Sequence, residues 1–335
     1  MDDYRTVSRL AWGPLMSEAA LCARDLGLLA TLRTHGALTP EQAHERTRLT
    51  LYAARILLEA CSAAELVRFD GERYSLTTAG ELYLSDDRVR VDTDFVHDVC
   101  YRGAFHLRES LTHGRPIGLR TLGGDWPTVY EALTRLPDNA QRSWFAFDHF
   151  YSDPLFANAL HAMERAEVKT ILDVGGNTGR FAVLAAKNHE VTVLDHPAQL
   201  GLTRRNAIRN EVRLQTQPID LLDHSAPFPT DFDAVWMCQL LDCFAEADVT
   251  KLLERARGAL SPKGKVWVVE PLWDRQPNDV ARYCVQATSL YFACIANGTS
   301  RMYHSSDLLR CAKEAGLVLD EERKIGPFHT LMTFT

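Results

Sequence analysis

The sequence has little of what would place a chain in a membrane, on a metal or in an oxidising compartment. No stretch approaches the roughly 18 apolar residues of a membrane-spanning helix, and the opening residues 1–5 are not the apolar run of a signal peptide. The eight cysteines include no C-x-x-C pair, and no set of His, Cys and Asp residues has metal-ligand spacing. We therefore expect a cytoplasmic protein with reduced thiols, no membrane partner and no metal.

Positive charge is also scarce. The 335 residues carry 37 Lys and Arg against 44 Asp and Glu, a net charge of −7, whereas a protein that follows nucleic-acid phosphates needs a basic face. We therefore expect no nucleic-acid partner. The chain does have length and an ordinary hydrophobic share of 46%, which predict two globular domains of roughly 150 residues each.

The first third of the chain has the order of a winged helix. Apolar residues at helical spacing predict a helix over residues 7–34, and Thr39-Pro40 and Thr50 look like the caps of two further helices. Asp70-Gly71 lies between two short alternating runs, which predicts a hairpin over residues 67–76. This order suits DNA binding or dimerisation, and the charge balance favours dimerisation. We assign residues 1–110 to a winged-helix-like dimerisation domain.

The rest of the chain, residues 111–335, alternates strands with helices. Residues 85–127 end in a Gly- and Pro-rich loop and are interpreted as the join between the domains, and helical spacing then runs over residues 128–164 with a break at Pro137. The alternation predicts an α/β domain with a Rossmann-like, doubly wound and mostly parallel sheet. The expected strands cover residues 170–174, 191–194, 212–215, 234–237, 265–269, 318–322 and 330–334.

A glycine loop and two spaced carboxylates follow the first three of these strands. The loop over residues 173–179 reads DVGGNTG and lacks the dinucleotide pattern G-x-G-x-x-G, because Asn177 stands where the middle Gly would be. Asp195 can accept both ribose hydroxyls of an adenosine-type ligand, and Asp220 can accept the amine of an adenine between two apolar neighbours. Each could instead serve a turn or a helix cap, but their order at successive strand ends predicts a cofactor site.

These motifs resemble those of class I S-adenosylmethionine-dependent methyltransferases. Nearly the whole chain is similar to the two-domain small-molecule O-methyltransferases, the family of caffeate and acetylserotonin methyltransferases. The segment Tyr74-Ser75-Leu76-Thr77-Thr78-Ala79-Gly80-Glu81 is similar to the family's wing, and residues 259–270 are similar to its turn and strand after the catalytic segment.

The resemblance implies a cofactor, partners and contacts. The cofactor is S-adenosyl-L-methionine with S-adenosyl-L-homocysteine as product, the first domain builds a homodimer, and the substrate is a small aromatic molecule, free or carrier-bound. The implied cofactor contacts are Asp173, Gly175, Gly176 and Gly179 at the methionine part, Asp195 at the ribose, and Asp220 and Leu221 at the adenine.

The catalytic segment departs from the family. Where the family has a His that deprotonates the substrate hydroxyl, the segment over residues 240–244 has Asp242, and a second family acid is replaced by Ser300. The family's orienting Glu is retained as Glu270. A carboxyl pKa of about 4 is a poor match to a phenol pKa of about 10. His149, in the aromatic stretch over residues 144–151, is therefore a second candidate base, with a packed core His as the equal alternative.

This departure leaves three reactions open. The first, which we favour, is methylation of a ring carbon ortho to a hydroxyl that Asp242 or His149 holds. The segments over residues 147–151 and 239–244 are similar to methyltransferases of bacterial aryl-polyene pathways, whose pigments carry such a methyl group. The second is O- or N-methylation, in which proximity to the donor provides most of the rate. The third is a non-methylating decarboxylase, hydroxylase or cyclase that keeps the cofactor site.

The acceptor pocket is expected beside the methyl donor. Core packing is the alternative for its aromatic candidates, and Cys238 and Cys243 flank the segment as inert buried thiols because no base lies near them in the sequence. The candidate pocket residues are Trp144, Tyr151, Met237, Gln239 and Tyr303.

Overall fold

The computed structural model describes residues 2–335, which form two compact units that divide between Asp94 and Phe95. This division precedes the expected domain boundary at residue 110 and places most of the expected join in the second unit. Within the described residues, no helix is both long and apolar enough to cross a membrane.

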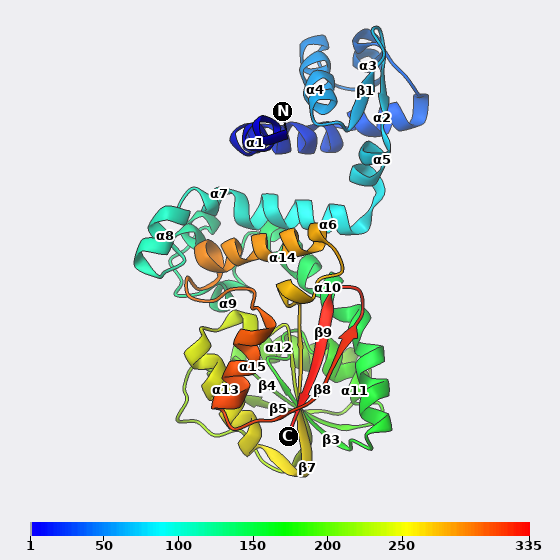
Figure 1. The fold of residues 1–335 in the computed structure, drawn as a ribbon. Coiled ribbons are helices and arrows are strands. Elements are labelled where there is room, and N and C mark those ends of the chain that lie inside the picture. The colour runs from blue at the N-terminus through cyan, green and yellow to red at the C-terminus, as the bar shows by residue number, and fades with distance from the viewer. Residues whose placement is uncertain (1) are drawn as a thin grey trace. The chain divides into compact units, whose positions relative to one another are not determined.

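The N-terminal unit contains helices and a two-stranded hairpin (Figure 1). The single helix expected over residues 7–34 is wrong: the chain turns at Gly27, whose φ of 79° lies in the left-handed region that glycine adopts without strain. Thr39 forms a capping box with Gln42, and the Thr50 side chain caps the fourth helix. The elements are α1 (Asp2–Asp25), α2 (Leu28–His35), α3 (Pro40–Arg46), α4 (Leu51–Ala63), β1 (Val67–Phe69), β2 (Tyr74–Leu76) and α5 (Thr78–Ser85), followed by α6 (Asp87–Phe95).

The hairpin pairs β1 with β2 in antiparallel register from Val67–Leu76 to Phe69–Tyr74, as the Asp-Gly turn predicts. Its inner residues Val67 and Tyr74 pack against α2 and α4 through Leu28 and Leu58. Helices followed by a hairpin are the expected order of elements in this unit.

The second unit begins with short helices, most of them in the segment that the sequence analysis interprets as the join between the domains. The helical signal is weak here because the segments are only four to seven residues long. Leu119 and Val129 from these segments lie in one apolar cluster with Phe95 of α6, Trp144 of α10 and Tyr291 of α14 (Asp279–Tyr291). The helical elements are the π-helical turn Val96–Cys100, α7 (Tyr101–Ala104), α8 (Leu107–His113), the 3-10 helix Ile117–Leu122, α9 (Val129–Ala132) and α10 (Asp138–Arg165).

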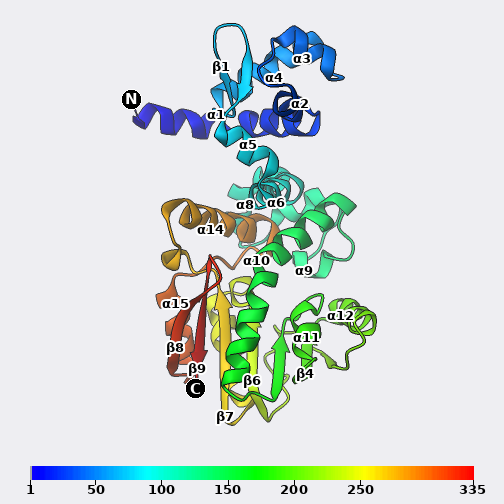
Figure 2. The same ribbon diagram turned by 90° about the vertical axis from the view of Figure 1, so that its right-hand side faces the viewer.

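A seven-stranded sheet forms the centre of this unit, in the order β5-β4-β3-β6-β7-β9-β8. Neighbours from β5 to β7 are parallel, and β9 is antiparallel to both β7 and β8. The expected mostly parallel, doubly wound sheet is confirmed, and Figure 2 shows β4 toward one edge and β8 with β9 at the other. The strands are β3 (Thr170–Val174), β4 (Glu190–Asp195), β5 (Gln215–Pro218), β6 (Phe232–Cys238), β7 (Leu260–Glu270), β8 (Leu319–Ile325) and β9 (His329–Phe334).

Helices cover both faces of the sheet (Figures 1 and 2). One apolar cluster joins the sheet to α13 and α15, and the other joins it to α10 and α11. The strand expected over residues 212–215 is displaced, since β5 begins at Gln215. The remaining elements are α11 (Arg180–Ala185), α12 (Pro197–Arg209), the 3-10 turns Leu241–Cys243 and Trp273–Arg275, α13 (Glu246–Gly258), the π-helical turn Phe292–Ala296 and α15 (Ser305–Glu314).

Candidate functional site

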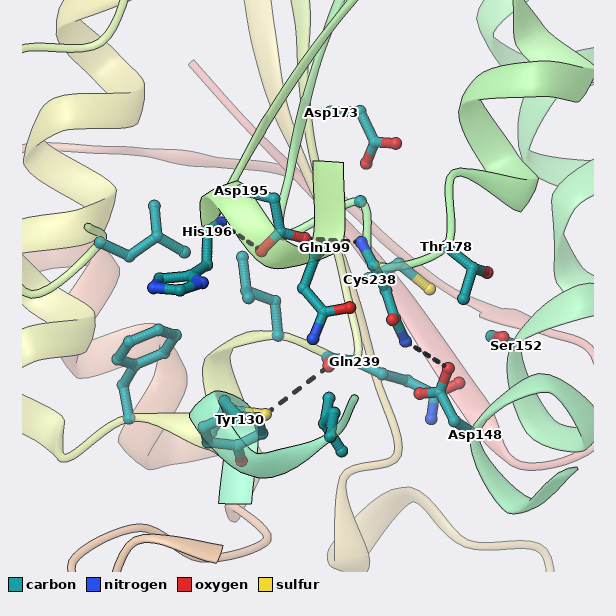
Figure 3. A pocket seen from close by; sticks show the side chains of 18 of the residues that line it. Tyr130, Asp148, Ser152, Asp173, Thr178, Asp195, His196, Gln199, Cys238 and Gln239 are labelled. Atoms are coloured by element: carbon teal, nitrogen blue, oxygen red, sulfur yellow. Dashed lines mark hydrogen bonds between the residues drawn. The ribbon is translucent and has the colours of Figure 1, made fainter. Parts of the chain in front are cut away.

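A cavity of about 460 Å³ opens at the carboxyl edge of the parallel strands. Its lining comes from the chain that follows β3, β4, β5 and β6, together with α9 and α10. This is the edge at which open α/β sheets bind ligands. Figure 3 shows Asp173 and Asp195 on one side of the cavity, with Tyr130 and Asp148 on the opposite side.

The glycine loop after β3 is shaped by two close approaches. Gly175 has a φ of 73°, and a Cβ at this position would lie 2.5 Å from Leu240 Cδ1. A Cβ at Gly176 would lie 2.6 Å from Val193 Cγ1 and 2.8 Å from Asp173 Oδ2. The two glycines therefore let the backbone fold back over the end of β3 without displacing the Asp173 carboxyl.

Asp173 is a buried acid at the floor of the cavity. It is 3% exposed, and its Oδ2 has no hydrogen-bond partner among the described residues. Burial, with repulsion from Asp195, raises the pKa of Asp173 to about 8. A buried carboxyl oxygen without a partner is costly, so this position favours a ligand with a cationic or hydrogen-bond-donating group.

Asp195 ends β4 and is held by two backbone groups. The Asn177 amide donates to its Oδ2 at 2.7 Å and the His196 amide to its Oδ1 at 2.6 Å. Burial raises the pKa of Asp195 to about 6 in spite of these bonds, which lower it. Each oxygen keeps a lone pair for a further donor, so the carboxylate can receive two vicinal hydroxyls.

The loop after β5 supplies an apolar slot with a polar end. Ile219, Asp220 and Leu221 all line the cavity. Asp220 is exposed, and its Oδ1 accepts the Leu222 amide at 2.9 Å. Flat apolar surface beside an acceptor suits a heteroaromatic ring with an amino group.

These features fit the cofactor that the sequence resemblance implies. S-adenosylmethionine is a cation with an amino group, a ribose and an adenine. The Asp173 carboxyl suits the cationic amino group, the Asp195 carboxylate suits the ribose hydroxyls, and the apolar slot after β5 suits the adenine. The Gln199 amide adds polar atoms without partners among the described residues. Gly179 differs from the other predicted contacts: it lies outside the cavity lining, at the start of α11 against Thr203.

The structure places Asp242 and Glu270 behind the cavity wall. Asp242 is 5% exposed on the 3-10 turn after β6, outside the lining, and its Oδ1 accepts the Cys243 thiol at 3.3 Å. Glu270 Oε1 accepts the Leu240 and Leu241 amides at 3.0 and 2.7 Å. Burial and their mutual repulsion raise the pKa of Glu270, and burial raises that of Asp242 to about 6. Glu270 therefore fixes the turn that carries Asp242.

His149 does line the cavity, but it is a weak base. Its Nε2 lies 3.1 Å from Thr178 Oγ1. Burial, with the charge of Arg180, lowers the pKa of His149 to about 4. The imidazole is therefore neutral at pH 7 and holds a proton poorly.

Asp148 is a cavity residue that the sequence did not single out as functional. Its Oδ2 accepts the Asn177 side-chain amide at 3.0 Å. Burial, with repulsion from Asp242 and Asp153, raises the pKa of Asp148 to about 7. The only signal for it in the sequence is its place beside His149 in the aromatic stretch, because Asn177 comes from the glycine loop after β3.

Two of the five residues predicted for the acceptor pocket line the cavity. Trp144 and Gln239 line the cavity, and Trp144 Nε1 donates to the Tyr291 hydroxyl at 2.7 Å. The other three lie outside the lining: Met237 is fully buried in β6, the Tyr303 hydroxyl donates to the Phe244 carbonyl, and Tyr151 packs against Phe147 and Phe328. Across residues 2–335, His, Cys, Asp and Glu side chains form no group of three or more suited to a metal ion.

The chain matches known proteins over most of its length. The model of the O-methyltransferase domain family matches residues 139–317, just over half of the chain. An L-tyrosine C(3)-methyltransferase of Streptomyces lavendulae is 27% identical over 85% of this chain and 80% of its own. An acetylserotonin O-methyltransferase of Mus musculus is 25% identical over 98% and 88%.

A solved structure supports the fold. The S-adenosylmethionine-dependent methyltransferase SibL superposes with a TM-score of 0.72 at 23% identity, covering 98% of each chain. The family match covers the carboxyl edge of the parallel strands and the cavity lining from Trp144 onward, whereas the lining residues on and around α9 precede it. The chain belongs to the O-methyltransferase domain family and is an S-adenosylmethionine-dependent methyltransferase.

Proposed function

We propose that this protein methylates an aromatic ring carbon ortho to a hydroxyl. The observation that carries the proposal is the acid-rich side of the cavity opposite Asp173. There Asp148 faces the cavity with Asp242 behind it, and His149 has too low a pKa to act as the family's basic imidazole. A carboxylate that accepts the hydrogen bond of a phenol increases electron density at the ortho carbon and makes that carbon the nucleophile.

The chain's own residues would hold both reactants. Asp173 and Gly175 would lie at the methionine part of S-adenosylmethionine, Asp195 at its ribose, and Asp220 with Leu221 at its adenine. When bound, this cofactor supplies a methyl group whose bond to sulfur breaks, with the electron pair going to sulfur, as the new bond to the acceptor forms. The residues around the acceptor then need only orient the ring and take its hydroxyl proton.

One relative supports the ring carbon as the acceptor atom. The Streptomyces lavendulae protein is named for methylation at C(3) of tyrosine, which is ortho to the tyrosine hydroxyl. The alternative, O-methylation, is favoured by the family description and by the acetylserotonin relative. The two reactions share the cofactor and differ in which acceptor atom faces the methyl group.

The experiment that separates them uses S-adenosylmethionine with a labelled methyl group. The protein is incubated with a panel of 4-hydroxyaryl compounds, and NMR of the product distinguishes a ring methyl from a methoxy group. We expect a ring methyl ortho to the hydroxyl. A methoxy product from every reactive acceptor would overturn the proposal in favour of O-methylation.

The charge of the cavity favours an acceptor without a free carboxylate. Besides the acids on the cofactor side, the lining includes Glu131, Asp148 and Asp153. Its one Arg or Lys among the described residues is Arg180, which is paired with Asp153. A carboxylate on the acceptor would be repelled by these acids, and no unpaired Arg or Lys side chain among the described lining residues would offset that repulsion. We therefore expect esters, amides or carrier-bound thioesters to be better acceptors than the matching free acids, measured as kcat/KM on matched pairs.

We infer further that the protein is a homodimer formed through its N-terminal unit. Helix α1 exposes Tyr4, Leu10, Trp12 and Leu15, each at least 64% accessible. Large apolar side chains gathered on one surface helix are typical of an interface. Sedimentation should give a dimer for the native protein and a monomer for Leu10→Asp with Trp12→Asp. Ile208→Asp, at an exposed site on α12, is the matched control and should leave the dimer unchanged.

A further inference from the structure

We propose that Asp148 is the catalytic residue that accepts the hydroxyl proton of the acceptor, and that Asn177 is the positioning residue that aims it. The inference rests on the proposed phenolic acceptor, but it does not depend on whether carbon or oxygen receives the methyl group. It assigns the proton to a side chain on α10 and not to the turn at which the family places its base.

The geometry favours Asp148 over the two predicted bases. Asp148 faces the cavity on the side opposite Asp173 (Figure 3). Asp242 lies outside the cavity lining, where its carboxyl accepts a hydrogen bond from the Cys243 thiol. His149 is engaged with Thr178 and lies 3.8 Å from Asp148 Oδ2. Of these three groups, Asp148 combines cavity access with a pKa near neutrality, which suits a general base at pH 7.

Asn177 ties this carboxylate to the cofactor loop. Its side-chain amide donates to Asp148 Oδ2, its backbone amide donates to Asp195 Oδ2, and its carbonyl accepts the Thr203 hydroxyl at 3.0 Å. Asn177 has a φ of 51°, so the left-handed turn that glycine favours is here made by a residue with a donor side chain. Asn177, at the position where the dinucleotide pattern has a glycine, thus orients the Asp148 carboxylate through its side-chain amide.

The charges around Asp148 explain its ionisation. Burial has the largest effect and raises the pKa, and Asp242 and Asp153 raise it further. The Asn177 hydrogen bond and the charge of Arg180 lower it. The groups that face Asp148 are His149 and Asp153 on α10, Arg180 on α11, Cys238 on β6, Asp242 on the following turn and Tyr291 on α14.

The proton balance is complete for ring methylation. The acceptor's hydroxyl proton passes to the Asp148 carboxylate as the ring carbon bonds to the methyl group. Asp148 then returns its proton to the acceptor oxygen and takes the ring proton from the methylated carbon, which restores the hydroxyl and the aromatic ring. One proton in total remains on Asp148 and leaves to solvent before the next turnover. For O-methylation, the same residue takes the same hydroxyl proton and no ring proton moves.

The test compares Asp148→Asn with the native protein, using the best acceptor of the panel. We expect turnover to fall by about 100-fold, the lower end of what general base catalysis contributes, with S-adenosylhomocysteine affinity within about twofold. Native activity should rise with pH through about 7, since the ionised carboxylate is the active form. The matched control is Asp138→Asn, an exposed carboxylate on the same helix, which should keep native turnover.

Asn177→Gly tests the positioning role, because glycine keeps the backbone turn and deletes only the side-chain donor. Loss of that hydrogen bond raises the pKa of Asp148, so the pH–rate profile should shift upward and activity should recover at higher pH. Native turnover in Asp148→Asn, or an unshifted profile in Asn177→Gly, would overturn the proposal. A methoxy product that still requires Asp148 would overturn ring methylation alone, and a ring-methyl product that does not require it would overturn this inference alone.

Discussion

The two sides of the cavity hold their carboxylates in different ways. On the cofactor side, Asp195 accepts two backbone amides and Asp220 accepts one, so their orientation follows from the course of the chain after each strand. On the acceptor side, Asp148 is held by the side chain of Asn177, and Asp242 by the thiol of Cys243. A backbone-held carboxylate tolerates sequence change around it, whereas a side-chain-held one depends on its partner. The comparison therefore predicts that substitutions of neighbouring side chains leave the cofactor-side carboxylates in place. On the acceptor side, a single substitution of the partner residue should change the orientation or the pKa of the carboxylate.

The largest expected effect comes from breaking the cofactor side at Asp195. Asp195→Ala removes the carboxylate that two ribose hydroxyls would share, and each such charged hydrogen bond contributes about 1.5 kcal/mol or more. Together they amount to about 3 kcal/mol, or roughly a 100-fold loss of S-adenosylhomocysteine affinity in calorimetry. Unchanged affinity would mean that Asp195 serves only the loop through Asn177 and His196.

Much of the fold and of the cofactor side follows from the sequence because the signals are local. Strand Thr170–Val174, the Asp70-Gly71 hairpin and the helix cap at Thr39 each depend on neighbouring residues, and all were predicted. The place of Asp195 at the cavity could be predicted for the same reason, because it ends strand β4. Asp148 was not found, because its partner Asn177 lies 29 positions away and approaches only when α10 packs on the sheet.

Burial also determines which candidate residues line the acceptor pocket, and short sequence motifs do not show it. Met237 and Tyr303 have residue types that suit an acceptor pocket, but the alternation of β6 turns Met237 into the core and the Tyr303 hydroxyl is used by the Phe244 carbonyl. The same alternation turns Trp236 and Cys238 toward the cavity. Which face of the sheet each side chain of a strand points to is known only once the strand is placed in the sheet. A shift of one residue along the strand therefore turns a core residue into a pocket residue.

The next largest effect is expected on the acceptor side, from a substitution at Asp242, which lies behind the cavity lining. Asp242→Asn removes a charge that raises the pKa of Asp148 and of Glu270 while keeping the shape of the side chain. The pH at which activity is half-maximal should therefore move downward, and kcat at its plateau should fall by about tenfold or less because a more weakly basic Asp148 is a poorer proton acceptor. A complete loss of activity at every pH, with cofactor affinity intact, would instead indicate that Asp242 itself takes the proton.

A stability measurement sharpens the comparison without any substrate. The pKa of Asp173 is raised in the folded state to about 8, so the folded protein binds a proton that the unfolded chain releases above about pH 4. The free energy of unfolding then falls as pH rises toward 8, by up to about 1.4 kcal/mol per pH unit for one group. Asp173→Asn cannot ionise, so in denaturant titrations of the ligand-free protein it should lose less stability between pH 5 and 8. Equal slopes in the two proteins would show that Asp173 is ionised in the fold.

The smallest effect is expected at Asp220, the most exposed of the cofactor-side carboxylates. Its side chain already accepts the Leu222 amide, and an exposed hydrogen bond to an adenine amine contributes about 0.5–1 kcal/mol, since water competes for it. Asp220→Ala should therefore weaken S-adenosylhomocysteine binding by only about two- to fivefold. The matched control, Asp223→Ala, removes an exposed carboxylate of the same loop that bonds Ser225, and it should leave affinity unchanged. A loss at Asp220 as large as that at Asp195 would mean that the loop closes over the adenine and excludes water, in which case Ile219 and Leu221 become the stronger determinants of affinity.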